Sequence, residues 1–256
     1  MKKLVKQILK SLNLYNTILK YLEFVNNLGS RRKRKNFYSQ LIGKEDLCFD
    51  VGANSGNRTE IFLSLGAKVV SIEPQDSCME ELKKRYLNNK NVFLVQKALG
   101  EKAGVALMQI NSSSTLSSIS EEWISKVNES GRFVDSSWQG EQEVEITTLE
   151  AVIKEYGLPV FCKIDVEGFE EKVLSGLNTP IKFISFEFAY ENIESSIRCL
   201  RRLSGIGNYR FNYSTGEDMV YDLKEWISFD EMVNILESFD NLNAWGDLYA
   251  KLEDQS

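Results

Sequence analysis

Hydrophobic and polar positions along the chain follow two periods. Short apolar runs, typical of buried strands, alternate with segments whose apolar residues recur every three or four positions, typical of helices. The runs predict strands at residues 47–51, 68–72, 92–95, 105–110, 143–147, 160–164, 181–186, 209–213 and 248–252. The helical spacing predicts helices at residues 57–65, 77–87, 149–156, 169–177, 193–203 and 229–239. Strand and helix in repetition indicate an α/β fold with a mostly parallel sheet covered on both faces, whose ligands bind beyond the carboxyl ends of the strands.

The N-terminal segment differs from the rest of the chain. Apolar residues between Leu4 and Val25 follow helical spacing and predict one or two amphipathic helices. Residues 1–35 carry ten lysines and arginines against one glutamate, whereas the remaining residues carry 21 against 36 acidic ones. We therefore expect a basic helical arm over residues 1–44 and a catalytic domain over residues 45–256. The arm could pack on the acidic body, or residues 1–35 could contact the anionic inner face of a membrane.

Composition narrows the possible chemistry. The chain has no histidine, which excludes Ser-His and Cys-His nucleophile pairs, an imidazole base and a histidine zinc site. None of the four cysteines stands in a C-x-x-C pair, and buried free thiols fit a reducing, cytoplasmic location. Nucleic acid is disfavoured as a partner because the acidic body would repel it. Proton transfer is left to a carboxylate, a lysine, a tyrosine, the substrate or a metal-bound water.

The strongest motif follows the first predicted strand. Asp50 ends that strand and is followed by the glycine-containing loop at residues 52–56, while Glu73 ends the second strand. An acid at this second position can accept both hydroxyls of a ribose, which indicates a ligand that contains adenosine. The loop lacks the dense glycines that admit a pyrophosphate, and Asp50 would repel one. An acid beside this loop suits an ammonium, such as that of S-adenosylmethionine.

A second acidic turn follows the strand at residues 160–164. Asp165 and Glu167 emerge at the ligand-binding edge, and either is a natural base for removing a proton from a hydroxyl nucleophile. Alternatively, Asp165 and Glu187, which lies near the end of the next strand, could bind a divalent metal ion through oxygen ligands. Lys163 precedes Asp165 by two residues and could orient or partner it.

Several segments resemble the FkbM family of class I methyltransferases. They lie at residues 49–56, 72–74, 97–100, 148–150, 161–176 and 245–250. The resemblance implies a Rossmann-like, seven-stranded sheet with helices on both faces and a reversed final hairpin, S-adenosylmethionine as donor, and O-methylation of a sugar, glycan or secondary-metabolite hydroxyl. By the same resemblance the loop residues hold the methionine moiety, Glu73 the ribose, and Lys97 and Ala98 the adenine. The loop residues assigned to this cofactor site are Asp50, Gly52, Ala53, Asn54 and Gly56.

Three further residues are candidates for the acceptor side. Ser114 lies in a serine-rich loop that could hydrogen-bond a polyol, Trp138 could stack on a sugar ring, and Tyr190 stands where similar sequences lead us to expect a histidine. Two rival functions stay open. A nucleotide-sugar oxidoreductase or epimerase would share the sheet, and a non-catalytic adaptor would use the basic arm to dock on a membrane.

Overall fold

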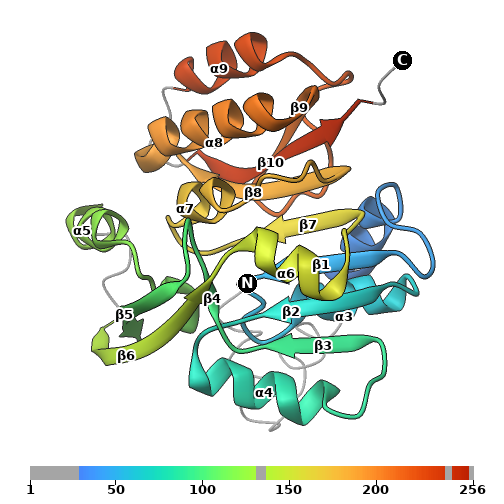
Figure 1. Ribbon diagram of the computed structural model, residues 1–256. Helices are drawn as coiled ribbons and strands as arrows, with labels where there is room; N and C mark the ends of the chain where they lie inside the picture. The colour runs from blue at the N-terminus through green and yellow to red at the C-terminus, as the bar shows by residue number, and fades with distance from the viewer. Residues whose placement is uncertain (1–28, 131–136, 240–243, 254–256) are drawn as a thin grey trace, which may run out of the picture.

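The computed structural model describes residues 29–130, 137–239 and 244–253 and contains a central sheet of seven strands (Figure 1). The strand order is β3-β2-β1-β7-β8-β10-β9, in which β10 runs antiparallel to both of its neighbours and the other pairs are parallel. The strands are β1 (Leu47–Val51), β2 (Lys68–Ile72), β3 (Val92–Val95), β7 (Phe161–Ile164), β8 (Phe183–Ala189), β9 (Tyr209–Thr215) and β10 (Trp245–Leu252). The predicted mostly parallel, seven-stranded sheet is confirmed, and the reversal expected in its final hairpin is that of β10.

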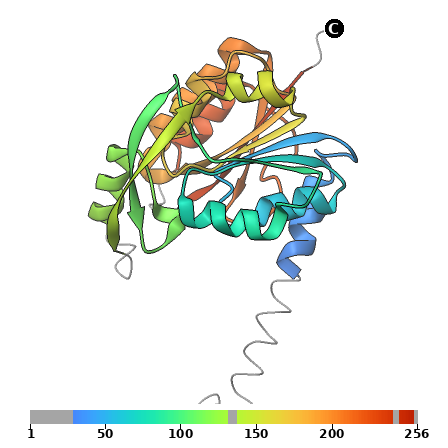
Figure 2. The same cartoon turned by 60° about the horizontal axis from the view of Figure 1, so that its bottom comes forward.

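Helices cover both faces of this sheet (Figures 1 and 2). On one face the largest apolar cluster joins the strands to α6 (Leu149–Tyr156), α7 (Glu170–Ser175), α8 (Ile193–Ile206) and α9 (Phe229–Glu237). The opposite face is covered by a helix at residues 29–38, by α3 (Asn57–Ser64) and by α4 (Asp76–Tyr86). Successive strand residues point to opposite faces, so each strand contributes to both layers.

A second, three-stranded sheet lies beside the carboxyl ends of the central strands (Figure 1). It consists of β4 (Ala98–Leu99), β5 (Gly104–Asn111) and β6 (Trp138–Thr147), and the chain between β5 and β6 contains the short helix η1 (Ser114–Leu116) and α5 (Glu121–Ser130). The sequence predicted strands at 105–110 and 143–147, but β6 begins earlier, at Trp138. After Trp138, β6 continues with the exposed residues Gln139, Gly140 and Glu141, so no apolar run marks its start.

The segment that precedes β1 docks on the central sheet. Phe37, Tyr38, Leu41 and Ile42 are buried in a cluster that includes Phe161. Three basic side chains of the preceding helix form ion pairs with the acidic body: Arg31 with Glu60, Lys33 with Asp218 and Arg34 with Glu217. Exposed ion pairs contribute little, so the apolar residues supply most of the docking free energy.

Most of the predicted arm, residues 1–28, lies outside the described residues, and so does the greater part of the segment expected to contact a membrane. Among the described residues, no helix combines the length and the apolar character that a bilayer crossing requires.

Two substitutions at Tyr38 test this docking. Its ring packs edge-on against Phe62 and Phe161, while its buried hydroxyl has no hydrogen-bond partner within the described part of the chain. Tyr38→Ala should lower the free energy of unfolding by about 3–5 kcal/mol, because it leaves a large cavity. Tyr38→Phe should change it by less than about 1 kcal/mol, because no bond is lost. Urea unfolding measures both, and equal losses would contradict this packing.

Candidate active site

A pocket opens where the carboxyl ends of β1, β2, β7 and β8 meet the three-stranded sheet. It holds about 850 Å³ of empty space, part of it open to solvent. One side is lined by Gly52, Asn54, Glu73, Lys97, Ala98 and Ser114. The other side is lined by Asp165, Glu167 and Glu187. The structure therefore brings the two predicted motifs, the glycine loop and the acidic turn, into one pocket.

The two motifs touch at the junction of β1 and β7. The backbone N–H of Asp165 donates to the carbonyl oxygen of Val51 at 2.9 Å, so the chains leave the two strands side by side. Gly52 adopts φ +79°, and a Cβ atom there would lie 1.8 Å from the carbonyl oxygen of Asp165. Only glycine combines this backbone conformation with so close an approach.

Glu73 fixes the glycine loop from the end of β2. One carboxylate oxygen accepts the N–H of Asn54 at 2.8 Å and the other accepts the N–H of Gln75 at 2.8 Å. Burial raises the pKa of Glu73 to about 7, against the lowering effect of these hydrogen bonds. Asn54 adopts φ +47° and its side-chain amide donates to the hydroxyl of Ser114 at 3.0 Å. The loop is therefore held in shape before any ligand arrives.

Three of the predicted cofactor residues lie beneath the pocket instead of lining it. Asp50 is 1% exposed and accepts a hydrogen bond from the hydroxyl of Thr59 at 2.6 Å, because its side chain points from β1 toward α3. Ala53 packs in the cluster that includes Leu82, and Gly56, at φ +85°, is the N-cap of α3. In this structure these residues support the loop, and the carboxylate of Asp50 bonds to α3 and does not line the pocket.

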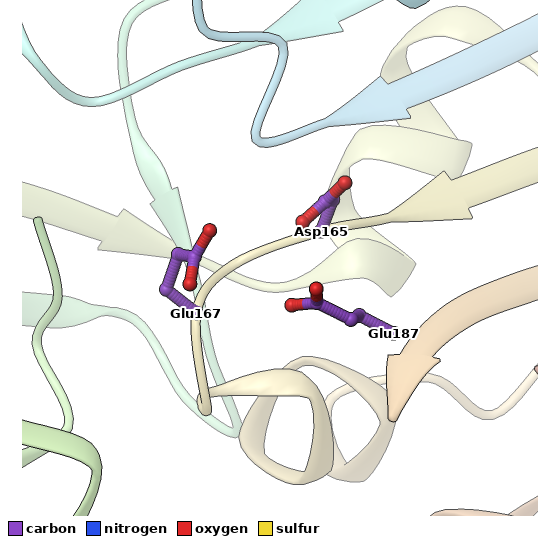
Figure 3. A group of neighbouring side chains, drawn as sticks. All are labelled: Asp165, Glu167 and Glu187. Atoms are coloured by element: carbon purple, nitrogen blue, oxygen red, sulfur yellow. The ribbon is translucent and has the colours of Figure 1, made fainter. Parts of the chain in front are cut away.

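The acidic turn forms a cluster with the end of β8 (Figure 3). Asp165, Glu167 and Glu187, here called the acid triad, place carboxylate oxygens within 4.8 Å of one another. Burial raises the pKa of Glu167 and of Glu187 well above the ordinary value, and the neighbouring carboxylates raise both further. Such a cluster favours a proton, a cationic ligand or a divalent metal ion, each of which relieves the repulsion.

Lys163, predicted to be catalytic, lies behind the acid triad. It is 1% exposed, and its Nζ lies 2.6 Å from Oδ1 of Asp247 on β10 and 3.3 Å from Oδ2 of Asp165. Burial by itself would lower the pKa of Lys163, but Asp165 and Asp247 outweigh it and raise the pKa well above its ordinary value. Lys163 therefore partners Asp165, one of the two roles expected for it, while Asp247 was missed although the resembling segment at residues 245–250 contains it.

Two more polar residues of the site were not identified from the sequence. Glu170 opens α7 and accepts the N–H groups of Val166 and Gly168 at 3.1 and 3.3 Å, which shapes the acidic turn. Gln75 lines the pocket and is 4% exposed, and its amide donates to the carbonyl of Ser114 at 3.0 Å. The side-chain oxygen of Gln75 is buried and has no partner among the residues that the structure describes. An acid in the first turn of a helix was a usable signal for Glu170, whereas nothing in the sequence marked Gln75.

Of the three predicted acceptor residues, one lines the pocket and two lie outside it. Ser114 lines the pocket as expected. Trp138 lies outside that lining, where it packs against Trp123 and donates from its indole to Asn128 at 2.9 Å. Tyr190 begins the short helix η2 (Tyr190–Asn192), also outside the lining, and its backbone N–H donates to the carbonyl of Ala244 at 2.8 Å.

Comparisons with known proteins show which family model the sequence matches. Residues 50–241 match the family model described as the Methyltransferase FkbM domain. Similar folds include precorrin-6y C5,15-methyltransferase from Geobacter metallireducens GS-15, at 11% identity and TM-score 0.47, with 86% of each chain covered. Another is Aeropyrum pernix fibrillarin with natively bound S-adenosyl-L-methionine, at 10% identity and TM-score 0.41, covering 82% of this chain and 68% of that one.

A third similar structure is a Streptococcus mutans protein in complex with SAH, at 13% identity and TM-score 0.40, covering 85% of this chain and 95% of that one. No curated protein matches the sequence significantly.

A pair of glycine substitutions tests the contact between the two motifs. Gly52→Ala should lower the free energy of unfolding by at least about 2 kcal/mol, because the new methyl group meets the Asp165 backbone at a positive φ. Gly104→Ala is the matched control, since a Cβ there meets open space, and it should change stability by less than about 1 kcal/mol. Thermal and urea unfolding measure both, and a neutral Gly52→Ala would refute the close approach.

Proposed function

The chain belongs to the FkbM methyltransferase family, and we propose that it transfers a methyl group from S-adenosylmethionine to a hydroxyl of a sugar, glycan or secondary metabolite. The observation that carries this proposal is the acid triad at the edge of the pocket that the glycine loop forms. Family membership favours this function over the oxidoreductase or epimerase that the sheet alone would allow.

The nucleoside half of the donor fits the side of the pocket around Glu73. Each oxygen of that carboxylate accepts one backbone N–H and keeps a lone pair for a ribose hydroxyl. The side-chain oxygen of Gln75 has no partner within the described ranges and could accept from a further donor of the nucleoside, because the amide group is held by Ser114. Lys97 and Ala98 line the same side, which supports their proposed contact with the adenine.

The donor supplies a methyl group on a positively charged sulfur. During transfer, a lone pair of the acceptor oxygen forms the new carbon–oxygen bond, the sulfur keeps the electrons of the broken bond, and the hydroxyl proton must leave. We assign to the acid triad, which lines the same pocket, the roles of attracting the sulfonium and receiving that proton. Lys163 offsets part of the negative charge at Asp165, and Glu170 holds the turn that presents Glu167.

The acid triad could also assist methyl transfer in a second way, by binding a divalent metal ion. Asp165, Glu167 and Glu187 present the hard oxygen ligands that Mg²⁺ and Mn²⁺ prefer, and a bound ion would lower the pKa of a coordinated hydroxyl. In that case the carboxylates hold the ion, and the proton leaves to water.

Donor binding is tested at Glu73. Glu73→Ala should weaken S-adenosylmethionine binding at least about tenfold, because it removes charged hydrogen bonds to the ribose and frees the loop. Glu80→Ala, which removes an exposed carboxylate on α4, should leave the dissociation constant unchanged. Isothermal titration calorimetry on folded samples measures both, and wild-type affinity in Glu73→Ala would move the ribose elsewhere.

Catalysis is tested at Asp165. Asp165→Asn should slow the formation of S-adenosylhomocysteine by about 10²- to 10⁴-fold, the usual contribution of a positioned acid or base, while affinity for S-adenosylhomocysteine, whose sulfur is uncharged, stays within about threefold. The assay follows S-adenosylhomocysteine by mass spectrometry across a panel of glycosides and phenols. Full turnover by this variant would place the proton acceptor outside the acid triad.

The same assay shows whether the acid triad acts as a base or as the ligand of a metal ion. Turnover by the wild type that survives EDTA assigns the acid triad the role of base. Turnover that EDTA abolishes and Mg²⁺ or Mn²⁺ restores assigns it the role of metal ligand, and the restoring concentration should then rise in Glu187→Gln.

A further inference from the structure

A buried carboxylate outside the pocket lies one strand away from the acid triad. Asp247 belongs to β10, which lies beside β8, and it stands opposite Glu187 in the register of these two strands (Figure 1). Residues opposite each other in an antiparallel pair direct their side chains to the same face of the sheet, with Cβ atoms roughly 5 Å apart. Asp247 is 6% exposed and does not line the pocket. Any effect that it has on a ligand therefore passes through its charge or through its neighbours.

Two cationic side chains keep Asp247 ionised inside the sheet. Its Oδ1 lies 2.6 Å from Nζ of Lys163, which is closer than the 3.3 Å between Lys163 and Asp165. Arg58, in the first turn of α3, attracts the same carboxylate. Burial by itself would raise the pKa of Asp247, but Lys163 and Arg58 outweigh it and hold this pKa below its ordinary value. The other oxygen accepts the hydroxyl of Tyr249 at 3.2 Å, so the position of the carboxylate is fixed.

The ammonium of Lys163 would by itself oppose the binding of a cation beside the acid triad. S-adenosylmethionine carries a positive charge on its sulfur, whereas the sulfur of S-adenosylhomocysteine is uncharged. Charge interactions inside a protein remain appreciable over about 10 Å, so an uncompensated Lys163 would weaken the binding of the donor relative to that of the product. Asp247 places an opposite charge 2.6 Å from this ammonium. At distances much longer than this spacing the two charges cancel.

We propose that Asp247, a positioning residue that touches no ligand, sets the preference of the donor site for a positively charged sulfur. Its carboxylate cancels the charge of Lys163 and leaves the acid triad free to favour the donor over the uncharged product. The inference rests on the proposed methyltransferase function and deepens it. With Asp247 in place, Lys163 orients Asp165 without repelling the sulfonium, and the product binds less tightly because it lacks the charge that the acid triad attracts.

Isothermal titration calorimetry on the full chain, with S-adenosylmethionine and with S-adenosylhomocysteine, measures this preference as the ratio of the two affinities. Asp247→Asn should lower the ratio at least about threefold in favour of the product, while affinity for S-adenosylhomocysteine itself stays within about twofold. Asp230→Asn is the matched control, because Asp230 is exposed in the first turn of α9, and it should leave the ratio unchanged. A folded Asp247→Asn with the wild-type ratio would overturn the proposal.

The same substitution in a chain without the lysine separates this role from that of a structural counter-ion. Lys163→Gln removes the buried ammonium, and the ratio should rise above that of the wild type. Adding Asp247→Asn should lower it again at least about threefold, because the charge of Asp247 still acts on the site. A residue that only pairs with Lys163 would have no effect in this background. That result would overturn the proposal even if Asp247→Asn alone does not fold.

The titrations also distinguish a failure of this inference from a failure of the proposed function. A folded wild type that binds neither S-adenosylmethionine nor S-adenosylhomocysteine would contradict the proposed function itself. Binding of both ligands, with a ratio that does not respond to Asp247→Asn, would overturn the role of Asp247 alone.

Discussion

The close approach of two chain segments at the β1–β7 junction is the constraint on which the site depends. Gly52 lies so near the backbone of Asp165 that no side chain fits between them, and Val51 accepts the N–H of Asp165. The order of the sheet reverses here, so the chains that leave β1 and β7 diverge and leave a crevice between the layers. One contact thus sets the distance between the loop that would hold the donor and the turn that would promote transfer.

The charged side chains of the site form two groups. In one, a buried lysine is paired with carboxylates, and in the other, acidic side chains outnumber basic ones. Lys163 is buried between Asp165 and Asp247, and this arrangement offsets the cost of placing its charge inside the sheet. If all three carboxyls of the acid triad were ionised, they would carry more negative charge than Lys163 balances, and burial together with the neighbouring carboxylates raises the pKa values of Glu167 and Glu187. A site that needs positive charge is chemically suited to a sulfonium donor, to a metal ion and to a departing proton.

The sequence was sufficient for the features that local pattern encodes. Apolar runs identified the central strands, and the acids and glycine at their ends directed attention to Gly52, Glu73, Asp165, Glu167 and Glu187, all of which line the pocket, whereas Asn54 was assigned through the family resemblance. The direction of the Asp50 side chain depends on α3, and the partner of Lys163 lies 84 residues away, so neither follows from local pattern. The position of Trp138 outside the pocket lining, against Trp123, depends likewise on how α5 packs, which no spacing rule predicts.

The central claim is that Glu73 holds the nucleoside while the acid triad faces the transferred methyl. A crystal structure with sinefungin, which carries an ammonium group where S-adenosylmethionine carries its methyl, tests it most directly. The account predicts ribose hydroxyls on the Glu73 carboxylate and the ammonium within about 3 Å of a carboxylate oxygen of Asp165, Glu167 or Glu187. A nucleoside bound away from Glu73, or an ammonium directed away from all three carboxylates, would contradict it.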